Sequence, residues 1–455
     1  MKQLQYDVAV IGGGPTGTAA AIASARCGAK TILIEQYGYL GGALTACGTG
    51  PQMTFHAGQR QVVTGIPEEL AAEMVRRGFS TGHVPDGVGF CATTTAFDPE
   101  GMKLVWEDAA IRSGVQLLYH AVFTGCTVEN GTVTAAQIHT KGGSYELRAK
   151  VFIDASADAD VATAAGIGSV FGRESDHLAQ PMTMNFRVYG VDREKLVDFV
   201  DSNREDMYAG TPRDLRSLRR YDISGAFSLI RAAKESGELS YDRDTVLCFE
   251  TSNDGEYIVN MTRVSRRSAV DAFDLTEAEI EGRRQVQETL RFLRKYVPGF
   301  ENCRLAYSGP NIGIRESRKI NGVYKLTAED LTANVMFPDA VAMGGYPIDL
   351  HSPDGQTTVH KYLKPGSWYS IPYRCMITHE IGNLIVAGRC ISATQEACSS
   401  TRLTPIVMAL GQAAGTAAAQ SVRSGVPANR IDTDELRRTL KENGVFLEEY
   451  RETDI

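Results

Sequence analysis

The 455-residue sequence lacks the features that define several large classes of protein. It has no block of basic residues, and 55 acidic side chains outnumber 47 lysines and arginines, so a nucleic acid is not an expected partner. Its nine cysteines are scattered without a Cys-x-x-Cys pair or zinc-ligand spacing, so neither a disulfide framework nor a metal site is expected. The first residues enter an apolar segment without a signal-peptide pattern. We therefore expect a cytoplasmic protein with reduced thiols.

One long stretch without charge raises the question of a membrane-spanning helix. The segment RLTPIVMALGQAAGTAAAQSVR holds twenty uncharged residues between Arg402 and Arg423, and about 20 apolar residues suffice to cross a bilayer. The segment is rich in alanine and contains glutamine, whereas a spanning helix is rich in leucine-like residues. Small side chains let other groups approach a helix backbone closely. We therefore predict a buried helix with Thr404 as N-cap and Pro405 in its first turn, and membrane association is not expected.

The amino-terminal segment has the pattern of a dinucleotide-binding unit. An apolar strand at residues 7–11 precedes Gly12, Gly14 and Gly17 in a G-x-G-x-x-G pattern, and an alanine-rich helix and a second apolar strand ending at Glu35 follow. The first glycine allows a tight turn, the second lets a diphosphate approach the backbone, and the third lets helix pack on strand. The helix N-terminus favours phosphate charge, and an acidic residue at this distance can accept hydrogen bonds from ribose hydroxyls. The pattern predicts a dinucleotide site without distinguishing NAD from FAD.

The residues that follow favour FAD. A glycine-rich loop at residues 38–50 would let the backbone lie along an extended ligand. Asn130-Gly131 and Gly142-Gly143 then separate alternating segments, which predicts a three-stranded antiparallel meander with two tight turns. A separate apolar strand ending at Asp154 is expected to return after it. A meander inserted as a crossover in a parallel sheet resembles the flavoprotein superfamily that includes glutathione reductase.

Nearly the whole chain resembles the bacterial FAD-dependent oxidoreductase family, relatives of the fumarate reductase flavoproteins. The resemblance is carried by DVAVIGGGPTGTAAA, YLGG, FIDASADADVATAAG, NMTRV, GIRESRKINGVYKLTAEDL, YPIDLHSP, IPYRCM, NLIVAGRCIS and GQAAGTAAA. It implies an α/β fold with a Rossmann-like FAD-binding domain, built on a parallel sheet with a β-meander crossover, and an α+β substrate or cap domain. It implies FAD as the cofactor but does not specify a substrate, because such scaffolds host varied chemistry.

The resemblance also implies domain boundaries and cofactor-binding residues. We expect a discontinuous FAD-binding domain at residues 1–170 and 375–425, a cap domain at 171–374, and a helical tail at 426–455. In such flavoproteins the start of the late alanine-rich helix points at the flavin, where its partial positive charge stabilises the reduced cofactor. The predicted cofactor-binding residues are Gly12, Gly14, Pro15, Thr16, Gly17, Glu35, Gln36, Gly41, Gly42, Ala43, Val122, Ala155, Ser156, Gly388, Arg389, Arg402, Thr404, Pro405 and Ile406.

The predicted cap domain contains one long helical pattern. Thr276 and Glu279 have the spacing of a capping box and indicate a helix start. An apolar face then continues until Pro298-Gly299 ends the pattern, and the arginines along it are expected to face solvent.

Polar residues near the two domain joins are the catalytic candidates. Arg315 could hold a substrate carboxylate bidentately, or it could form an internal ion pair with Glu316. Asp349 and His351 occupy alternate positions of a strand and therefore share one face. A histidine can accept a proton from a hydroxyl as hydride leaves, so His351 is a candidate base, although it could equally be a structural histidine.

Further candidates lie where the cap is expected to meet the FAD domain and beside the glycine-rich loop. Tyr373 and Arg374 occupy the predicted join, and His56 follows the loop and could reach the flavin. Disulfide reductases of the superfamily place a second cysteine five residues after the first, but position 52, five residues after Cys47, is glutamine. This argues against a dithiol enzyme, and Cys390 and Cys398 are expected in the core.

The sequence predicts an FAD-dependent oxidoreductase that transfers a hydride between flavin N5 and a small polar organic substrate, such as a hydroxy acid or sugar derivative. No second glycine motif for NAD(P)H occurs, so a separate electron donor or acceptor is expected. Fumarate-reductase-like ene reduction, with Arg315 or Arg374 as proton donor, is one alternative. A non-catalytic dinucleotide-binding subunit of a larger complex and a peripheral lipid reductase are others. A homo-oligomer is possible, and no metal is expected.

Overall fold

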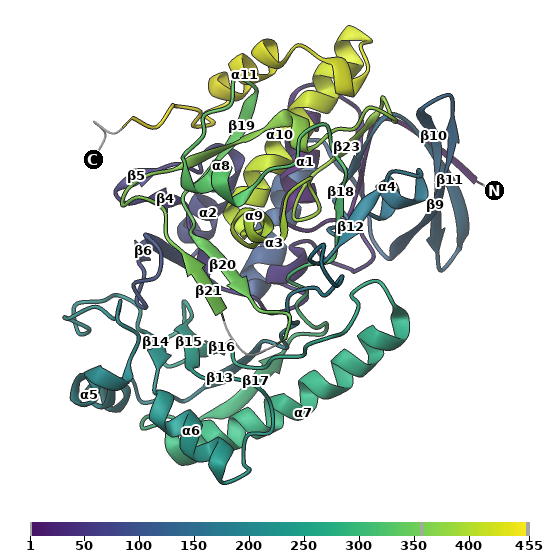
Figure 1. The fold of residues 1–455 in the computed structure, drawn as a ribbon. Helices are drawn as coiled ribbons and strands as arrows, with labels where there is room; N and C mark the ends of the chain where they lie inside the picture. Colours follow the sequence, from purple (N-terminus) through teal and green to yellow (C-terminus); the bar gives the residue numbers. More distant parts are fainter. Residues whose placement is uncertain (1, 355–357, 452–455) are drawn as a thin grey trace.

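The computed structural model describes residues 2–354 and 358–451. It has a mixed α/β architecture in which a Rossmann-like domain carries a smaller sheet-and-helix domain on one side (Figure 1). The last four residues of the predicted helical tail lie outside the described ranges.

The main sheet of the first domain has seven strands and is largely parallel around its centre. Strand β1 ends in a fully buried VAVI segment, which fits a parallel strand covered on both faces. The strand order is β8 (Gln116–Leu118), β2 (Thr31–Ile34), β1 (Lys2–Ile11), β11 (Gly143–Asp154), β10 (Thr132–Thr140) and β9 (Ala121–Glu129), and β23 (Leu384–Val386) pairs with β11.

The predicted meander is confirmed, with two corrections. Strands β9, β10 and β11 pair antiparallel with tight turns at Asn130-Gly131 and Lys141-Gly142, so the second turn falls one residue before the predicted Gly142-Gly143. The strand ending at Asp154 is not separate, because β11 runs unbroken from the meander into the centre of the sheet. Residues 143–147 of β11 pair antiparallel with β10, and residues from Tyr145 to Asp154 pair parallel with β1, so one strand belongs to both parts.

The uncharged segment forms helix α10 (Thr404–Ser424), which packs against helix α1 (Pro15–Arg26). A Cβ atom at Gly411 would lie 2.1 Å from the backbone oxygen of Thr16, and one at Gly415 would lie 2.1 Å from that of Ala20. The small residues therefore serve a close contact between two helix backbones. The helix starts one residue earlier than predicted, with Leu403 rather than Thr404 as N-cap. No helix within the described ranges is long and apolar enough to cross a membrane.

Other elements complete the first domain around this pair of helices (Figure 1). Its remaining helices are α2 (Ile66–Arg76), α3 (Pro99–Arg112), α4 (Asp160–Ala164), α8 (Ala328–Thr332), α9 (Gln395–Thr401) and α11 (Thr433–Glu442). Its small sheets are β3 (Gln52–Met53) with β7 (Thr93–Phe97) and β6 (Ser80–Pro85), β4 (His56–Ala57) with β5 (Arg60–Gln61), β12 (Ser169–Phe171) with β18 (Arg318–Ile320), β19 (Ala340–Gly344) with β22 (Tyr369–Pro372), and β20 (Ile348–His351) with β21 (Thr358–Lys361).

The cap has its own apolar core, formed by residues between Met182 and Ile312. Its antiparallel sheet runs β14 (Asp222–Gly225), β15 (Val246–Glu250), β16 (Tyr257–Val259), β13 (Phe186–Tyr189) and β17 (Arg304–Ser308), with helices α5 (Arg193–Ser202), α6 (Phe227–Glu235) and α7 (Ala272–Tyr296).

Helix α7 begins four residues before the predicted capping box. Asp271 is its N-cap and accepts hydrogen bonds from the amides of Phe273 and Asp274, so the first turn is already satisfied. Thr276 instead donates to the carbonyl of Ala272, and Glu279 accepts from the amide of Ile312.

The chain returns to the first domain earlier than the predicted boundary at residue 375. Residues from Ile320 onward join the apolar clusters of the first domain, including Leu326, Trp368 and Tyr369. The chain leaves the first domain after strand β12 and returns through strand β18, and these two strands pair with each other. Outside the β20–β21 hairpin, which also contacts the cap, the described residues between 320 and 374 therefore pack with the first domain.

Candidate active site

The first glycine turn is built for close backbone approach. Gly12 has a φ of 102°, and a Cβ there would lie 2.4 Å from the backbone oxygen of Ala155. A Cβ at Gly17 would lie 1.8 Å from the backbone oxygen of Gly12. At Gly14 the nearest atom would be 3.7 Å away, which is ordinary contact distance. Gly12 and Gly17 therefore keep strand, turn and helix together, while Gly14 leaves space in front of the N-terminus of α1.

Glu35 closes the same turn from the end of β2. Its carboxylate accepts hydrogen bonds from the amide of Gly13 at 2.6 Å and the amide of Tyr37 at 2.8 Å. Burial raises the pKa of the Glu35 carboxyl, and these amide hydrogen bonds oppose the shift. The sequence predicts a ribose-binding role for Glu35, and the structure adds that it also fixes the loop.

A cavity of about 220 Å³ lies at this turn. It brings together most of the residues predicted to bind the cofactor, from widely separated parts of the chain. Lining it are Gly12, Gly14, Pro15, Thr16, Glu35, Gln36, Gly42, Ala43, Val122, Ala155, Ser156, Arg389, Arg402 and Thr404. The predicted residues that do not line it are Gly17, Gly41, Gly388, Pro405 and Ile406.

A second cavity, of about 350 Å³, lies between the first domain and the cap. Ala43, Arg389, Arg402 and Thr404 line both cavities, so the two adjoin at the start of α10. An extended two-part ligand could therefore occupy the small cavity and reach the large one.

Two arginines where the cavities adjoin, Arg389 and Arg402, indicate that an anionic dinucleotide would fit there. Arg389 forms an ion pair with Asp158 at 2.6 Å, yet its Nε is buried without a hydrogen-bond partner in the described part of the chain. The Nε of Arg402 is also buried without a partner among the described residues. Unpaired buried donors carry a free-energy cost that an anionic ligand would remove. Together with the glycine turn, these donors fit the diphosphate and flavin of FAD.

One wall of the large cavity is the hairpin formed by β20 and β21, which lies between the two domains in Figure 1. Asp349 pairs with His360 across the hairpin, and His351 pairs with Thr358. Residues two apart on a strand share a face. All four side chains therefore lie on one face, and all four residues line the cavity.

His351 has both ring nitrogens engaged by protein groups. Its Nδ1 lies 3.0 Å from a guanidinium nitrogen of Arg263, which can only donate, so Nδ1 must accept. Its Nε2 then carries the hydrogen and faces Asp349 Oδ2 at 3.4 Å. Burial and the nearby arginine charges lower the pKa of His351 to about 3. His351 thus lacks a free lone pair for a substrate proton, and its predicted role as base is not supported.

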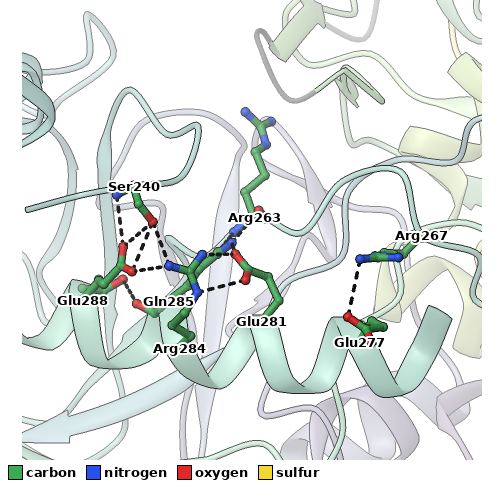
Figure 2. Close-up of polar contacts among 9 residues, drawn as sticks. Ser240, Arg263, Arg267, Glu277, Glu281, Arg284, Gln285 and Glu288 are labelled. Carbon is green, nitrogen blue, oxygen red and sulfur yellow. Dashed lines mark hydrogen bonds and ion pairs between the residues drawn. The ribbon is translucent and has the colours of Figure 1, made fainter. Parts of the chain in front are cut away.

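Arg263 is held in place by helix α7. Its amide donates to Gln285 Oε1 at 2.7 Å, and Gln285 Nε2 donates back to the Arg263 carbonyl at 3.0 Å. Figure 2 shows the Arg263 guanidinium extending away from helix α7 and from the ion pairs that the glutamates of this helix form. The backbone is thus pinned on one side while the guanidinium reaches His351 on the other.

Arg315 does not pair with Glu316, one of the alternatives open from the sequence. Glu316 instead pairs with Lys319. The Arg315 guanidinium donates to the carbonyl of Pro181 at 2.6 Å and to the hydroxyl of Thr183. Burial and the charge of nearby Arg402 lower the pKa of Arg315 well below its ordinary value, although a guanidinium stays protonated in proteins. It therefore contributes a positive charge to the cavity wall.

The other catalytic candidates lie elsewhere. Tyr373 is 1% exposed and donates its hydroxyl to the carbonyl of Ala428 at 2.9 Å. Arg374 pairs with Asp339 at 2.9 Å at the surface. Neither residue lines the large cavity. His56 also lies outside both cavities, with its ring bonded to Thr93.

The cysteines have no redox arrangement. All nine are free, and burial raises the pKa of the Cys47 thiol to about 12. Cys390 and Cys398 are buried and their thiols face backbone carbonyls, as expected for core residues. Among the described residues, no group of three metal-ligating side chains could hold an ion.

The low pKa of His351 predicts a pH-dependent contribution to stability. An unfolded histidine binds its proton near pH 6.5, whereas folded His351 does so only near pH 3. The unfolded state binds more protons between these values, so stability should rise with pH across that window and be lost as pH falls. His351→Gln should flatten this slope in denaturant unfolding between about pH 4 and 6. His139→Gln, on the exposed meander, should keep it, and equal slopes in both variants would contradict the assignment.

The fold and the two adjoining cavities define a Rossmann-like dinucleotide-binding protein with a cap domain over its site. The model of the FAD dependent oxidoreductase family matches residues 7–440, so the chain belongs to this family, and its cofactor is FAD. The match supports the family named from the sequence, without specifically showing the wider group of glutathione and fumarate reductases.

Several similar proteins are named as phospholipid reductases, and solved structures with the same fold include flavin-dependent enzymes. A digeranylgeranylglycerophospholipid reductase from Methanoculleus marisnigri is 28% identical over 36% of this chain and 42% of its own length. The chain spans about half the length of the curated relatives it matches. Two solved structures share the fold. A geranylgeranyl bacteriochlorophyll reductase-like protein from Thermoplasma acidophilum has a TM-score of 0.50 at 14% identity, with 97% of this chain and 83% of that chain covered. The flavin-dependent brominase Bmp2 has a TM-score of 0.51 at 15% identity, with 96% and 83% covered.

Sequence reasoning missed several residues of the large cavity, above all His360, Thr358 and Arg243. His360 and Thr358 alternate on β21 just as Asp349 and His351 do on β20. The alternation of Thr358 and His360 is visible in the TTVHK segment, but the sequence does not show that this segment pairs with β20.

Proposed function

We propose that this chain is an enzyme that oxidises or reduces a small polar organic substrate of the hydroxy-acid or sugar-acid type, and that the substrate carries an anionic group. When bound, FAD supplies the hydride chemistry through its N5. The large cavity would hold the substrate, and a separate electron donor or acceptor would complete the cycle. Membership of an oxidoreductase family favours an enzyme over a non-catalytic subunit.

The observation that carries this proposal is the excess of positive over negative charge in the lining of the large cavity. Arg243, Arg315 and Arg402 line it, and none of them forms an ion pair among the described residues. Burial and the charge of Arg263 lower the pKa of Arg243 to about 10, so it too remains charged at neutral pH. Asp244 and Asp349 are the acidic residues of the lining. A carboxylate would pair with these guanidinium groups bidentately.

The names of the relatives support a second candidate, the reduction of a prenyl lipid. Curated proteins similar to this chain are digeranylgeranylglycerophospholipid reductases. The cavity has an apolar part, with Phe90, Phe227 and Phe249 in its lining. The charged groups in the same lining favour the small anion, because an apolar chain would leave them without partners.

Anaerobic titration of the yellow holoenzyme would distinguish these candidates. Hydroxy acids and sugar acids should bleach the oxidised flavin absorbance, and their neutral amides should bleach it at least about 10-fold more slowly, since one lost charged contact costs more than about 1.4 kcal/mol. Reoxidation of the reduced enzyme by an unsaturated dicarboxylate would indicate ene reduction. Reoxidation only by a geranylgeranyl lipid in detergent would overturn the small-anion proposal.

A further inference from the structure

A second histidine of the large cavity, His360, has a different set of contacts from His351. It lies opposite Asp349 in the β20–β21 hairpin, and its Nε2 is 3.1 Å from Asp349 Oδ1. Since an ionised carboxylate only accepts hydrogen bonds, this contact places the ring hydrogen on Nε2. Nδ1 of His360 then keeps its lone pair, and no hydrogen bond to Nδ1 occurs among the described residues.

Asp349 is held as an anion by the groups around it. Burial would raise the pKa of its carboxyl, but the neighbouring imidazoles and the charge of Arg402 hold it well below its usual value. Its Oδ2 faces His351 Nε2 at 3.4 Å and the Tyr346 hydroxyl at 3.5 Å, while Oδ1 faces His360. One carboxylate oxygen is thus anchored by the cavity wall, and the other orients His360.

The ring of His360 is packed but accessible. Phe90 lies against it with ring centroids 4.8 Å apart, and Tyr362 lies 6.3 Å away. The His360 side chain keeps 31% of its surface exposed, against 12% for His351. Both His360 and Phe90 line the cavity. Of the two histidines, His360 alone combines a fixed orientation, a free lone pair and access to the cavity.

We propose that His360, oriented by Asp349, accepts the substrate proton during oxidation, and that His351 is a positioning residue that holds Asp349. This inference rests on the proposed function. For an alcohol substrate, the hydrogen on carbon would leave as hydride, with the electron pair of its bond, and bound FAD would supply the oxidant. The hydroxyl proton passes to Nδ1 of His360, and the carbon–oxygen double bond forms. In the opposite direction, protonated His360 returns the same proton.

Chemical rescue tests this assignment. In the holoenzyme, His360→Ala should retain FAD but slow anaerobic flavin reduction by an anionic alcohol donor about 10²–10⁴-fold, the usual contribution of a general base. Added imidazole should restore much of the rate, because it can enter the vacated, partly exposed site. His351→Ala is the matched control, since its imidazole acts through Asp349, and added imidazole should not restore its lost rate. His360→Gln should be as slow as His360→Ala, which guards against a packing effect of the alanine.

The outcomes separate the two proposals. If no anionic donor bleaches the wild-type holoenzyme, the proposed function fails before any variant is compared. If a donor bleaches it and His360→Ala reduces at the wild-type rate, His360 is not the proton acceptor. A slow His360→Ala enzyme that imidazole does not restore, or an imidazole rescue confined to His351→Ala, would also overturn the assignment.

Discussion

Replacement of Arg315 by methionine is expected to lower kcat/KM for an anionic donor by about 100-fold, because losing a charged partner of a buried pair costs about 3 kcal/mol. Arg315 lines the large cavity, and its guanidinium donates hydrogen bonds to neutral oxygens of Pro181, Thr183 and Asn260. A substrate carboxylate would therefore be the one anionic group in direct contact with the Arg315 guanidinium. The loss should fall mainly on KM, since the contact exists in the ground state and the transition state alike. Anaerobic flavin-reduction kinetics at varied donor concentration would measure it.

Two controls make the Arg315 prediction specific. Arg291→Met makes the same chemical change on the exposed face of helix α7 and should leave the kinetics unchanged. The neutral amide of the same donor should lose little when Arg315 is replaced, so the preference for the acid over the amide should collapse. An unchanged acid-to-amide preference in Arg315→Met would show that the guanidinium does not bind the anion.

The substitution Gly411→Ala is expected to destabilise the protein by about 3 kcal/mol, at the upper end of the usual cost of overpacking. The added methyl group would lie 2.1 Å from the Thr16 backbone oxygen, and a backbone atom cannot rotate away as a side chain can. Helix α1 would have to shift, and its first residues Pro15 and Thr16 line the cofactor cavity. Weaker FAD retention should therefore accompany the loss of stability. Denaturant unfolding and flavin absorbance after gel filtration would measure the two effects.

The meander offers a matched control for this change. A Cβ at Gly142 would meet only the Thr140 hydroxyl at 3.9 Å, so Gly142→Ala adds the same methyl group without a clash. Its stability and FAD content should equal those of the wild type within about 0.5 kcal/mol. If Gly411→Ala behaved like Gly142→Ala, the close contact between α1 and α10 would not be required for the cofactor cavity.

Local pattern was sufficient where neighbouring residues decide the structure. The glycine turn, the two hairpin turns of the meander and the alternation of Asp349 with His351 all depend on short-range geometry. The predicted start of helix α7 was wrong because the sequence contains two possible N-cap residues, Asp271 and Thr276. Asp271 satisfied the first turn, and the later Thr-x-x-Glu pattern became part of the helix interior.

Long-range pairing explains the catalytic candidates that sequence reasoning misplaced. The sequence placed Tyr373 and Arg374 at the boundary between the two domains. In the structure the chain returns to the first domain near strand β18, and no change in amino-acid composition marks that point in the sequence. Arg315 could have paired with its neighbour Glu316, but in the folded chain Glu316 pairs with Lys319 and Arg315 lines the cavity.

By itself, the sequence determined the dinucleotide-binding turn, the α/β class with its meander, and a late helix that admits close backbone contact, because each follows from residue size and local periodicity. The tertiary structure decided which backbone fills that contact and how the ring nitrogens of the two histidines are engaged. These outcomes depend on helix docking and strand register, which bring residues far apart in the chain to within a few ångströms of each other.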